Sequence, residues 1–144
     1  MTSGQHLAEL PELLLDRSLG GIAVPALLRA AGLRVHTLVE IYGSRAGEVD
    51  DAEWLCYAGQ HGWPVLLKDQ RIRYRAAERV VITAHGITAF CLTGADLRPA
   101  VLVEHFLGVL DEIALACARP GPSLHLISAS GMRGVPLDRW LTDS

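Results

Sequence analysis

Two short apolar stretches that each run into an aspartate constrain this chain more than any other feature. Leu13–Leu15 leads directly into Asp16, and Val65–Leu67 leads through one lysine into Asp69. A short continuous apolar run is typical of a central strand that is covered on both faces. In open α/β sheets, functional side chains gather at the carboxyl ends of such strands. The two stretches therefore predict two buried strands, each delivering one carboxylate to an edge of the sheet.

The rest of the chain alternates helix and strand patterns. Apolar residues at helical spacing, closed by glycine or proline, predict helices over residues 22–31, 51–61, 76–85 and 97–118. Further strands are predicted over residues 33–38, 87–92 and 124–127. Residues 40–50 are predicted to be a polar loop, and either Asp50 or Asp51 is expected to cap the helix that follows. Repeated alternation of this kind predicts a parallel sheet with helices on both faces.

The expected fold is a three-layer α/β/α domain with a parallel, five-stranded sheet in the flavodoxin-like order 2-1-3-4-5. No internal repeat or linker divides the chain, so residues 1–144 are predicted to form a single domain. In this order the first and third strands are neighbours, and Asp16 and Asp69 are expected to face one another. Two carboxylates at one place repel each other unless a cation lies between them. The pattern therefore predicts a site for a hard divalent cation, Mg²⁺ or Mn²⁺.

The charge balance argues against a generally basic nucleic-acid binder, because the formal net charge is −3. The basic residues are nevertheless concentrated, since five of the thirteen Lys and Arg residues lie within residues 68–79. A charged run of this kind is usually a solvated helix face. Its position beside Asp69 gives it a second interpretation, as a local basic patch next to the predicted cation site.

The cysteines and the apolar runs indicate a cytoplasmic protein. Cys56, Cys91 and Cys117 are odd in number, widely spaced and set among apolar neighbours, which favours reduced core residues over a disulfide framework. The N-terminus lacks the basic and apolar regions of a signal peptide. The apolar runs are too short and too interrupted to span a bilayer, so no membrane association is expected.

Several other kinds of site are excluded by spacing. The six histidines are scattered, and no pair has the short spacing of a zinc site. The chain has neither a P-loop nor a G-x-G-x-x-G motif. A haloacid-dehalogenase phosphatase requires a second aspartate two residues after Asp16, where this chain has Ser18. A response-regulator receiver requires an acidic pair at the first strand, which is also missing.

Four blocks of sequence carry a family resemblance. Residues 13–20, 24–32, 51–55 and 62–69 together resemble the compact PIN-like domains, and are similar to the ribonuclease toxins of bacterial VapBC-type toxin–antitoxin pairs. The resemblance covers residues 12–92 and implies an Mg²⁺-dependent endoribonuclease with a cognate antitoxin. It implies catalytic acids at Asp16, Asp51 and Asp69, with Glu40 as a further match. Many PIN domains carry another Asp or Asn after the last acid, where this chain has residues Gln70–Ile72.

On this interpretation, Asp16 and Asp69 hold the metal directly, and Asp51 holds it directly or through water. Each acid also has an ordinary alternative, since an aspartate before a helix is a common cap and a loop glutamate such as Glu40 is commonly solvated. The residues expected to position RNA phosphates, with a solvated surface as the alternative, are Arg17, Lys68, Arg71 and Arg73.

Two other function classes remain open at the level of sequence. One is a non-catalytic PIN-like module that binds RNA or a protein partner. The missing further acid supports it, as does the apolar helix around Phe106, which offers a surface for a partner or for a homodimer. The other is a small-ligand protein of the flavodoxin class, which would have a deep apolar pocket at the switch point of the sheet instead of a carboxylate cluster.

Overall fold

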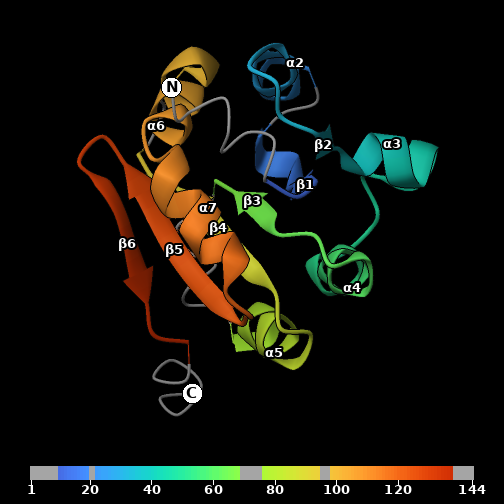
Figure 1. Ribbon diagram of the computed structural model, residues 1–144. Helices are drawn as coiled ribbons and strands as arrows, with labels where there is room; N and C mark the ends of the chain where they lie inside the picture. Colours follow the sequence, from blue (N-terminus) through green and yellow to red (C-terminus); the bar gives the residue numbers. More distant parts are fainter. Residues whose placement is uncertain (1–9, 20–21, 69–75, 95–97, 138–144) are drawn as a thin grey trace.

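The computed structural model describes residues 10–19, 22–68, 76–94 and 98–137 of the chain (Figure 1). Three residues singled out from the sequence, Asp69, Arg71 and Arg73, lie outside these ranges. The predicted acids Asp16, Glu40 and Asp51 lie within them. None of the helices in the described ranges has the length and apolar character needed to cross a bilayer.

The middle layer is a six-stranded sheet in the order β2-β1-β3-β4-β5-β6. Its strands are β1 (Leu13–Leu15), β2 (Val35–His36), β3 (Val65–Leu67), β4 (Thr88–Leu92), β5 (Ser123–Ser128) and β6 (Gly131–Val135). Strands β1 to β5 are parallel to their neighbours, so the predicted order of the parallel strands is confirmed. The register places Leu15 beside Leu66, so β1 and β3 end at the same edge of the sheet.

The prediction of five strands was wrong, because β6 adds an antiparallel strand after β5. The chain reverses between Ser128 and Gly131, which are the first pair of the β5–β6 ladder. Gly131 has a φ of 126°, a conformation that favours glycine over other residues. Gly131 therefore permits the tight reversal of a hairpin, and β6 becomes the outer strand next to β5.

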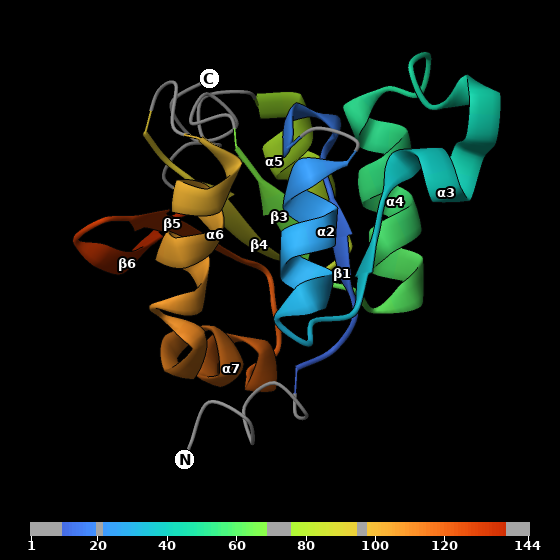
Figure 2. The same ribbon diagram turned by 90° about the horizontal axis from the view of Figure 1, so that it is seen from above.

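Helices lie on both faces of the sheet, as predicted (Figures 1 and 2). They are α2 (Ala23–Ala30), α3 (Leu38–Tyr42), α4 (Asp51–His61), α5 (Ala76–Ala84), α6 (Pro99–Leu107) and α7 (Leu110–Ala118). Two short 3-10 turns also occur, η1 (Arg17–Leu19) and η2 (Gly43–Arg45). One core cluster joins the sheet to α2, α6 and α7, and the other joins it to α4 and α5.

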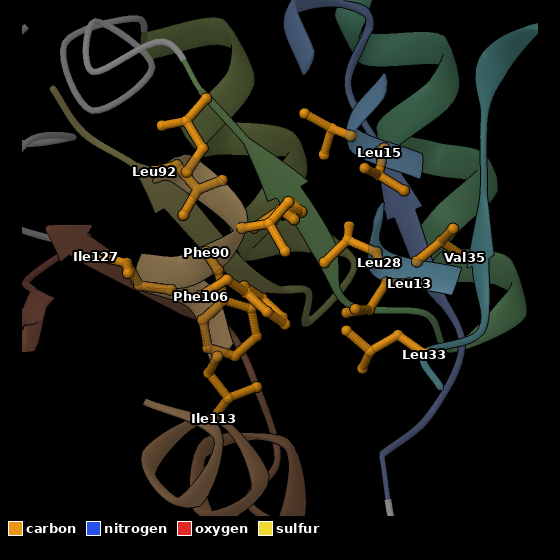
Figure 3. Packing of buried hydrophobic residues seen from close by; sticks show 14 of the residues in the cluster. Leu13, Leu15, Leu28, Leu33, Val35, Phe90, Leu92, Phe106, Ile113 and Ile127 are labelled. Carbon is orange, nitrogen blue, oxygen red and sulfur yellow. The ribbon is translucent and has the colours of Figure 1, made fainter. Parts of the chain in front are cut away.

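The two core clusters follow from alternation along the strands. Leu13 and Leu15 point to the α2–α6–α7 face, where Figure 3 shows them near Leu28, while Leu14 points to the opposite face. Phe106 is fully buried in the first cluster (Figure 3). Burying one such side chain contributes roughly 1.5–3 kcal/mol to folding. Phe106 itself is therefore committed to the core, and the surface that the helix around it would offer to a partner or a second copy stays a prediction.

Two predicted elements differ from the structure. Residues 38–42 form α3 instead of ending a strand and entering a loop, because Thr37 and Glu40 make a capping box at the start of this helix. The predicted helix over residues 97–118 is two helices, α6 and α7. It breaks at Gly108, a poor helix former, and at Val109, whose φ of −123° and ψ of 28° are not helical.

Candidate active site

Asp16 follows β1 directly at the carboxyl edge of the sheet. Its backbone N–H donates to the carbonyl of Leu66 at 3.0 Å, which ties it to β3, the strand that leads toward Asp69. Only 9% of Asp16 is exposed. The hydroxyl of Ser18 donates a hydrogen bond to its Oδ2. The chain therefore turns through η1 in a way that buries this carboxyl and gives it one local donor.

The surroundings of Asp16 disfavour its negative charge. Burial raises the pKa of Asp16 above its ordinary value, the Ser18 hydrogen bond opposes this, and the negative charge of Asp51 raises it further. Arg17 follows Asp16 in the chain and contacts Asp51, so the carboxyl of Asp51 lies close enough for its charge to act on Asp16. A buried carboxyl beside a second carboxyl is a site that a cation would stabilise.

Asp51 is the first residue of α4 and is not its N-cap. The cap is Asp50, whose side chain accepts from the backbone N–H of Glu53 at 2.9 Å. The Oδ1 of Asp51 instead accepts from the indole Nε1 of Trp54 at 3.0 Å. Since Trp54 is fully buried, its fixed ring holds the Asp51 carboxylate in one orientation. Sequence reasoning missed this partner, although the three-residue spacing from Asp51 to Trp54 within a helix could have suggested it.

Arg17 connects the end of β1 with the segment that leads into α4. Its Nη2 donates to the carbonyl of Ala46 at 3.0 Å and to the carbonyl of Val49. Its Nη1 lies 3.8 Å from Oδ1 of Asp51. These partners belong to the protein itself, so Arg17 positions residues 46–49 and Asp51 around Asp16. A contact with phosphate, the role predicted from the sequence, stays a prediction.

Lys68 is half-buried and follows β3, so it lies at the same edge of the sheet as Asp16. Asp69, Arg71 and Arg73 come next in the chain and lie outside the described residues. Within the described ranges, no three His, Cys, Asp or Glu side chains gather into a potential metal site. Asp16 and Asp51 are the predicted metal ligands that these ranges contain.

Glu40 has a structural role in α3. Its Oε1 accepts from the backbone N–H of Thr37 at 3.0 Å, which completes the capping box, and Arg29 Nη2 lies 2.8 and 2.7 Å from its two carboxylate oxygens. Burial opposes ionisation, but the hydrogen bonds from Arg29 and Thr37 outweigh it and lower the pKa of Glu40. The oxygens of Glu40 are directed to the helix start and to Arg29, which favours an ordinary structural role, and its catalytic role stays a prediction.

A cavity of about 220 Å³ opens beside Asp16. Its walls are Leu15, Asp16, Arg17, Thr37, Leu38, Val39, Ala46 and Gly47. These residues come from the end of β1, the start of α3 and the segment before α4. Sequence reasoning missed this hollow because it depends on α3, although the Thr37-to-Glu40 spacing is a recognisable capping signal. The hollow gives a ligand a route to a carboxyl that is otherwise buried.

A comparison with models of known families matches residues 11–94 to a PIN like domain. The chain belongs to the PIN-like domain family. Among curated proteins it is 37% identical, over 125 residues, to "Putative ribonuclease VapC45" of Mycobacterium tuberculosis (strain ATCC 25618 / H37Rv). That match covers 86% of this chain and 91% of the relative. No solved structure gives a significant match.

The PIN-like match confirms the resemblance on which the sequence interpretation depended, including its VapC-type character. The matched residues contain all three predicted metal ligands, Asp16, Asp51 and Asp69. In this PIN-like protein the hairpin formed by β5 and β6 lies beyond the segment that the family model covers, but the match to the mycobacterial relative covers most of the chain. The carboxyl edge of the sheet is thus formed in part by residues that match the family model and in part by the hairpin, which lies beyond the matched residues.

Proposed function

We propose that this PIN-like protein is a cytoplasmic, Mg²⁺-dependent endoribonuclease and the toxin of a type II toxin–antitoxin pair. The observation that carries the proposal is the buried carboxyl of Asp16, which lies at the carboxyl end of β1 and interacts with Asp51 at the start of α4. The relative from Mycobacterium tuberculosis, which is named as a ribonuclease, supports the same activity.

The residues present fit a hard divalent cation. Burial and the charge of Asp51 both disfavour the ionised form of Asp16. A bound cation would favour that ionised form and so offset both effects. Asp16 and Asp69 would hold Mg²⁺ or Mn²⁺ directly, with Asp51 holding it directly or through a water molecule. When bound, the metal would supply an activated water and stabilise the negative charge that develops on the phosphate.

The other residues hold the acids and the substrate in place. Trp54 and Arg17 both contact Oδ1 of Asp51 and so restrain its carboxylate. Lys68, at the end of β3, would contact phosphate oxygens next to the scissile bond. Arg71 and Arg73 would contact further phosphates along the RNA. The reaction is hydrolysis, in which water adds to phosphorus and the bond from phosphorus to the leaving ribose oxygen breaks.

Substitution of single acids tests the proposal. Asp16→Asn, Asp51→Asn and Asp69→Asn should each lower Mg²⁺-dependent cleavage of single-stranded RNA by a factor on the order of 100 or more, with circular dichroism unchanged. Glu112→Gln removes an exposed carboxylate from α7 and serves as the matched control, because the change in net charge is the same. Full cleavage by purified Asp16→Asn would refute the metal-site assignment.

Metal titration separates the nuclease from a non-catalytic PIN-like module. Calorimetry should show Mg²⁺ or Mn²⁺ binding to the wild-type protein and its loss in Asp69→Asn. Residues Gln70–Ile72, which replace the further acid of many PIN domains, are the observation that favours the non-catalytic alternative. If RNA binds while neither metal binding nor cleavage occurs, the protein is a binding module.

The partner is proposed to be a small antitoxin with a DNA-binding domain. If the protein is a toxin, the gene immediately upstream should encode that antitoxin. Expression of this chain alone should arrest growth, and co-expression with the upstream gene product should relieve the arrest and yield a stable complex. A chain that cleaves RNA in vitro but never inhibits growth would retain the ribonuclease assignment and lose the toxin assignment.

A further inference from the structure

A second hollow, of about 310 Å³, lies at the carboxyl ends of β4 and β5. We propose that it binds a phosphate group of the single-stranded RNA whose scissile bond is held at Asp16, a few nucleotides away. This inference rests on the proposed ribonuclease function and names a second contact for the same substrate. The residues that matter are Thr93 at the end of β4, Ser128 and Ser130 at the hairpin turn, and Arg133 on β6.

The chemistry of the hollow suits a phosphate. The hydroxyls of Ser128 and Ser130 share a hydrogen bond of 2.9 Å, so one of their two protons is used between them and the other is available to a phosphate oxygen. Arg133 is exposed, and within the described ranges it has no ion-pair partner. None of the described residues that line the hollow is acidic. An arginine beside a hydroxyl is a common way to bind phosphate oxygens.

The walls of the hollow are held by backbone and side-chain bonds that leave these groups in place. Thr93 donates twice to the carbonyl of Ile127, from its backbone N–H at 2.8 Å and from its hydroxyl at 3.1 Å. The backbone N–H of Ser130 donates to the hydroxyl oxygen of Ser128 at 3.3 Å. The ends of β4 and β5 are therefore tied together, and the hairpin turn presents its hydroxyls in a fixed arrangement.

The hollow lies on the same face of the sheet as Asp16. Leu14, Cys91 and Leu126 belong to the core cluster under α4 and α5. Alternate side chains along a strand point to the same face, so the residue two positions after each of them points to that face as well. These residues are Asp16 after Leu14, Thr93 after Cys91 and Ser128 after Leu126. Arg133 pairs with Leu126 across the β5–β6 ladder, which places its side chain on this face too.

The separation of the two sites suits one strand of RNA. From β1 to β5 the sheet order counts three strand steps, past β3 and β4. At roughly 4.8 Å for each step, this is about 14 Å. An RNA chain that lies across the carboxyl edge of the sheet would pass Lys68 at the end of β3 and reach the hollow after a few nucleotides. The alternative is that Ser128 and Ser130 only stabilise the hairpin turn.

Binding measurements on a non-cleaving parent test the inference. In the Asp16→Asn background, fluorescence anisotropy with a labelled single-stranded RNA should show about tenfold weaker binding for Arg133→Ala. The slope of log K against log salt should fall by about one, as expected for one lost phosphate contact. Arg133→Lys should restore most of the affinity. Arg119→Ala is the matched control, because Arg119 is also exposed but precedes β5 at the amino edge.

Cleavage by the otherwise wild-type protein gives a second measurement. With a long RNA substrate, Arg133→Ala should raise KM about tenfold and leave kcat unchanged, because the contact is made equally in the ground and transition states. With a dinucleotide substrate it should change neither value, because the RNA is too short to reach the hollow. Double substitution of Ser128 and Ser130 by alanine should weaken binding of the long RNA. A lower melting temperature with unchanged RNA binding would show that the two serines only stabilise the hairpin turn.

The outcomes distinguish this inference from the proposed function. If the wild-type protein cleaves RNA but Arg133→Ala binds as tightly as its parent with the same salt slope, the phosphate site is refuted and the ribonuclease stands. If the protein never cleaves RNA but binds it in an Arg133-dependent way, the ribonuclease is refuted and the phosphate site stands. If the parent does not bind single-stranded RNA at all, both are refuted.

Discussion

The Nη1 of Arg17 lies 3.8 Å from the Oδ1 of Asp51, although the two residues are far apart in the chain. The same guanidinium donates to the carbonyls of Ala46 and Val49. Arg17 thereby holds the segment before α4 against the end of β1, next to Asp16. The carboxylates of the candidate site are kept near one another by a basic residue that neutralises part of their repulsion.

Removal of the Arg17 side chain should therefore affect stability and catalysis together. Arg17→Ala is expected to lower the free energy of unfolding by about 1–3 kcal/mol, because carbonyls in the segment before α4 lose a charged donor. It should also lower kcat, because Asp51 loses one of its anchors. Urea unfolding and RNA cleavage check the two effects. Lys68→Ala is the comparison, and should raise KM with no loss of stability. If Arg17→Ala raises only KM, Arg17 is a substrate contact.

Neutralisation of Asp16 should stabilise the metal-free protein at neutral pH. The pKa of Asp16 is raised in the folded state, mainly by burial. Above the ordinary carboxyl pKa of about 3.9, the unfolded chain loses this proton before the folded chain does, so the stability of the wild-type protein falls as pH rises. The fall is complete above the folded pKa. Asp16→Asn has no such carboxyl, so its free energy of unfolding does not fall in this way. The difference in stability between Asp16→Asn and the wild-type protein should therefore grow as pH rises from the ordinary carboxyl pKa to the folded-state pKa of Asp16.

The same pair of proteins should respond differently to Mg²⁺. At a free concentration 100 times Kd, a bound ion would stabilise the wild-type protein by about 2.7 kcal/mol. Asp16→Asn should gain much less. An Asp16→Asn protein that is less stable than wild type at neutral pH without metal would contradict the electrostatic description of this carboxyl.

Glu40 should prove to be a structural residue. Glu40→Gln retains an acceptor for the backbone N–H of Thr37 and loses only an exposed ion pair with Arg29, which is worth about 0.2–1 kcal/mol. Its cleavage rate should therefore match that of the wild-type protein. Thr37→Ala, by contrast, removes the cap of α3 and should cost about 1 kcal/mol in urea unfolding. A loss of cleavage in Glu40→Gln as severe as in Asp16→Asn would return Glu40 to the catalytic set.

A close backbone contact at the amino edge of the sheet should make Gly121 intolerant of a side chain. A Cβ at this position would collide with the main-chain carbonyl of Gly86, in the turn that precedes β4. Gly121→Ala is therefore expected to lower the free energy of unfolding by about 1–3 kcal/mol. Gly47→Ala is the control for stability, since a Cβ added there would meet no atom within 4 Å and the φ of Gly47 is not positive. Equal stability of the two variants would contradict this packing.

The parallel part of the fold follows from the sequence because its signals are local and mutually consistent. The apolar runs that became β1 and β3 can be covered on both faces only in a parallel sheet with helices on each side. The order of these strands then brings the end of β1, with Asp16, beside the strand that leads to Asp69. That Asp16 and Asp51 serve one site was implied only by the family resemblance, and it stays a prediction.

The remaining parts depend on contacts that no local pattern reports. The helical apolar pattern continues through Gly108, so the break between α6 and α7 is visible only once both helices pack on the sheet. Strand β6 contains Gly131 and Gly134, which have low strand propensity, and it forms because β5 offers a free edge. The partners of Arg17 are main-chain carbonyls, which have no signature in a sequence.

The antiparallel hairpin of β5 and β6 lies apart from the middle of the sheet, so a substitution has different consequences in the two places. Asp16 follows β1 in the middle of the sheet, where a change of sequence disturbs both core clusters. Arg133 and Gly134 lie instead on an outer strand with exposed side chains, beyond residue 94, where the family match ends. Substitutions in this hairpin can alter the charge and shape at one end of the carboxyl edge while the acids stay in place. If the proposed phosphate contact exists, substitutions in the hairpin would change the choice of RNA without touching Asp16, and a designer seeking to redirect cleavage would begin there.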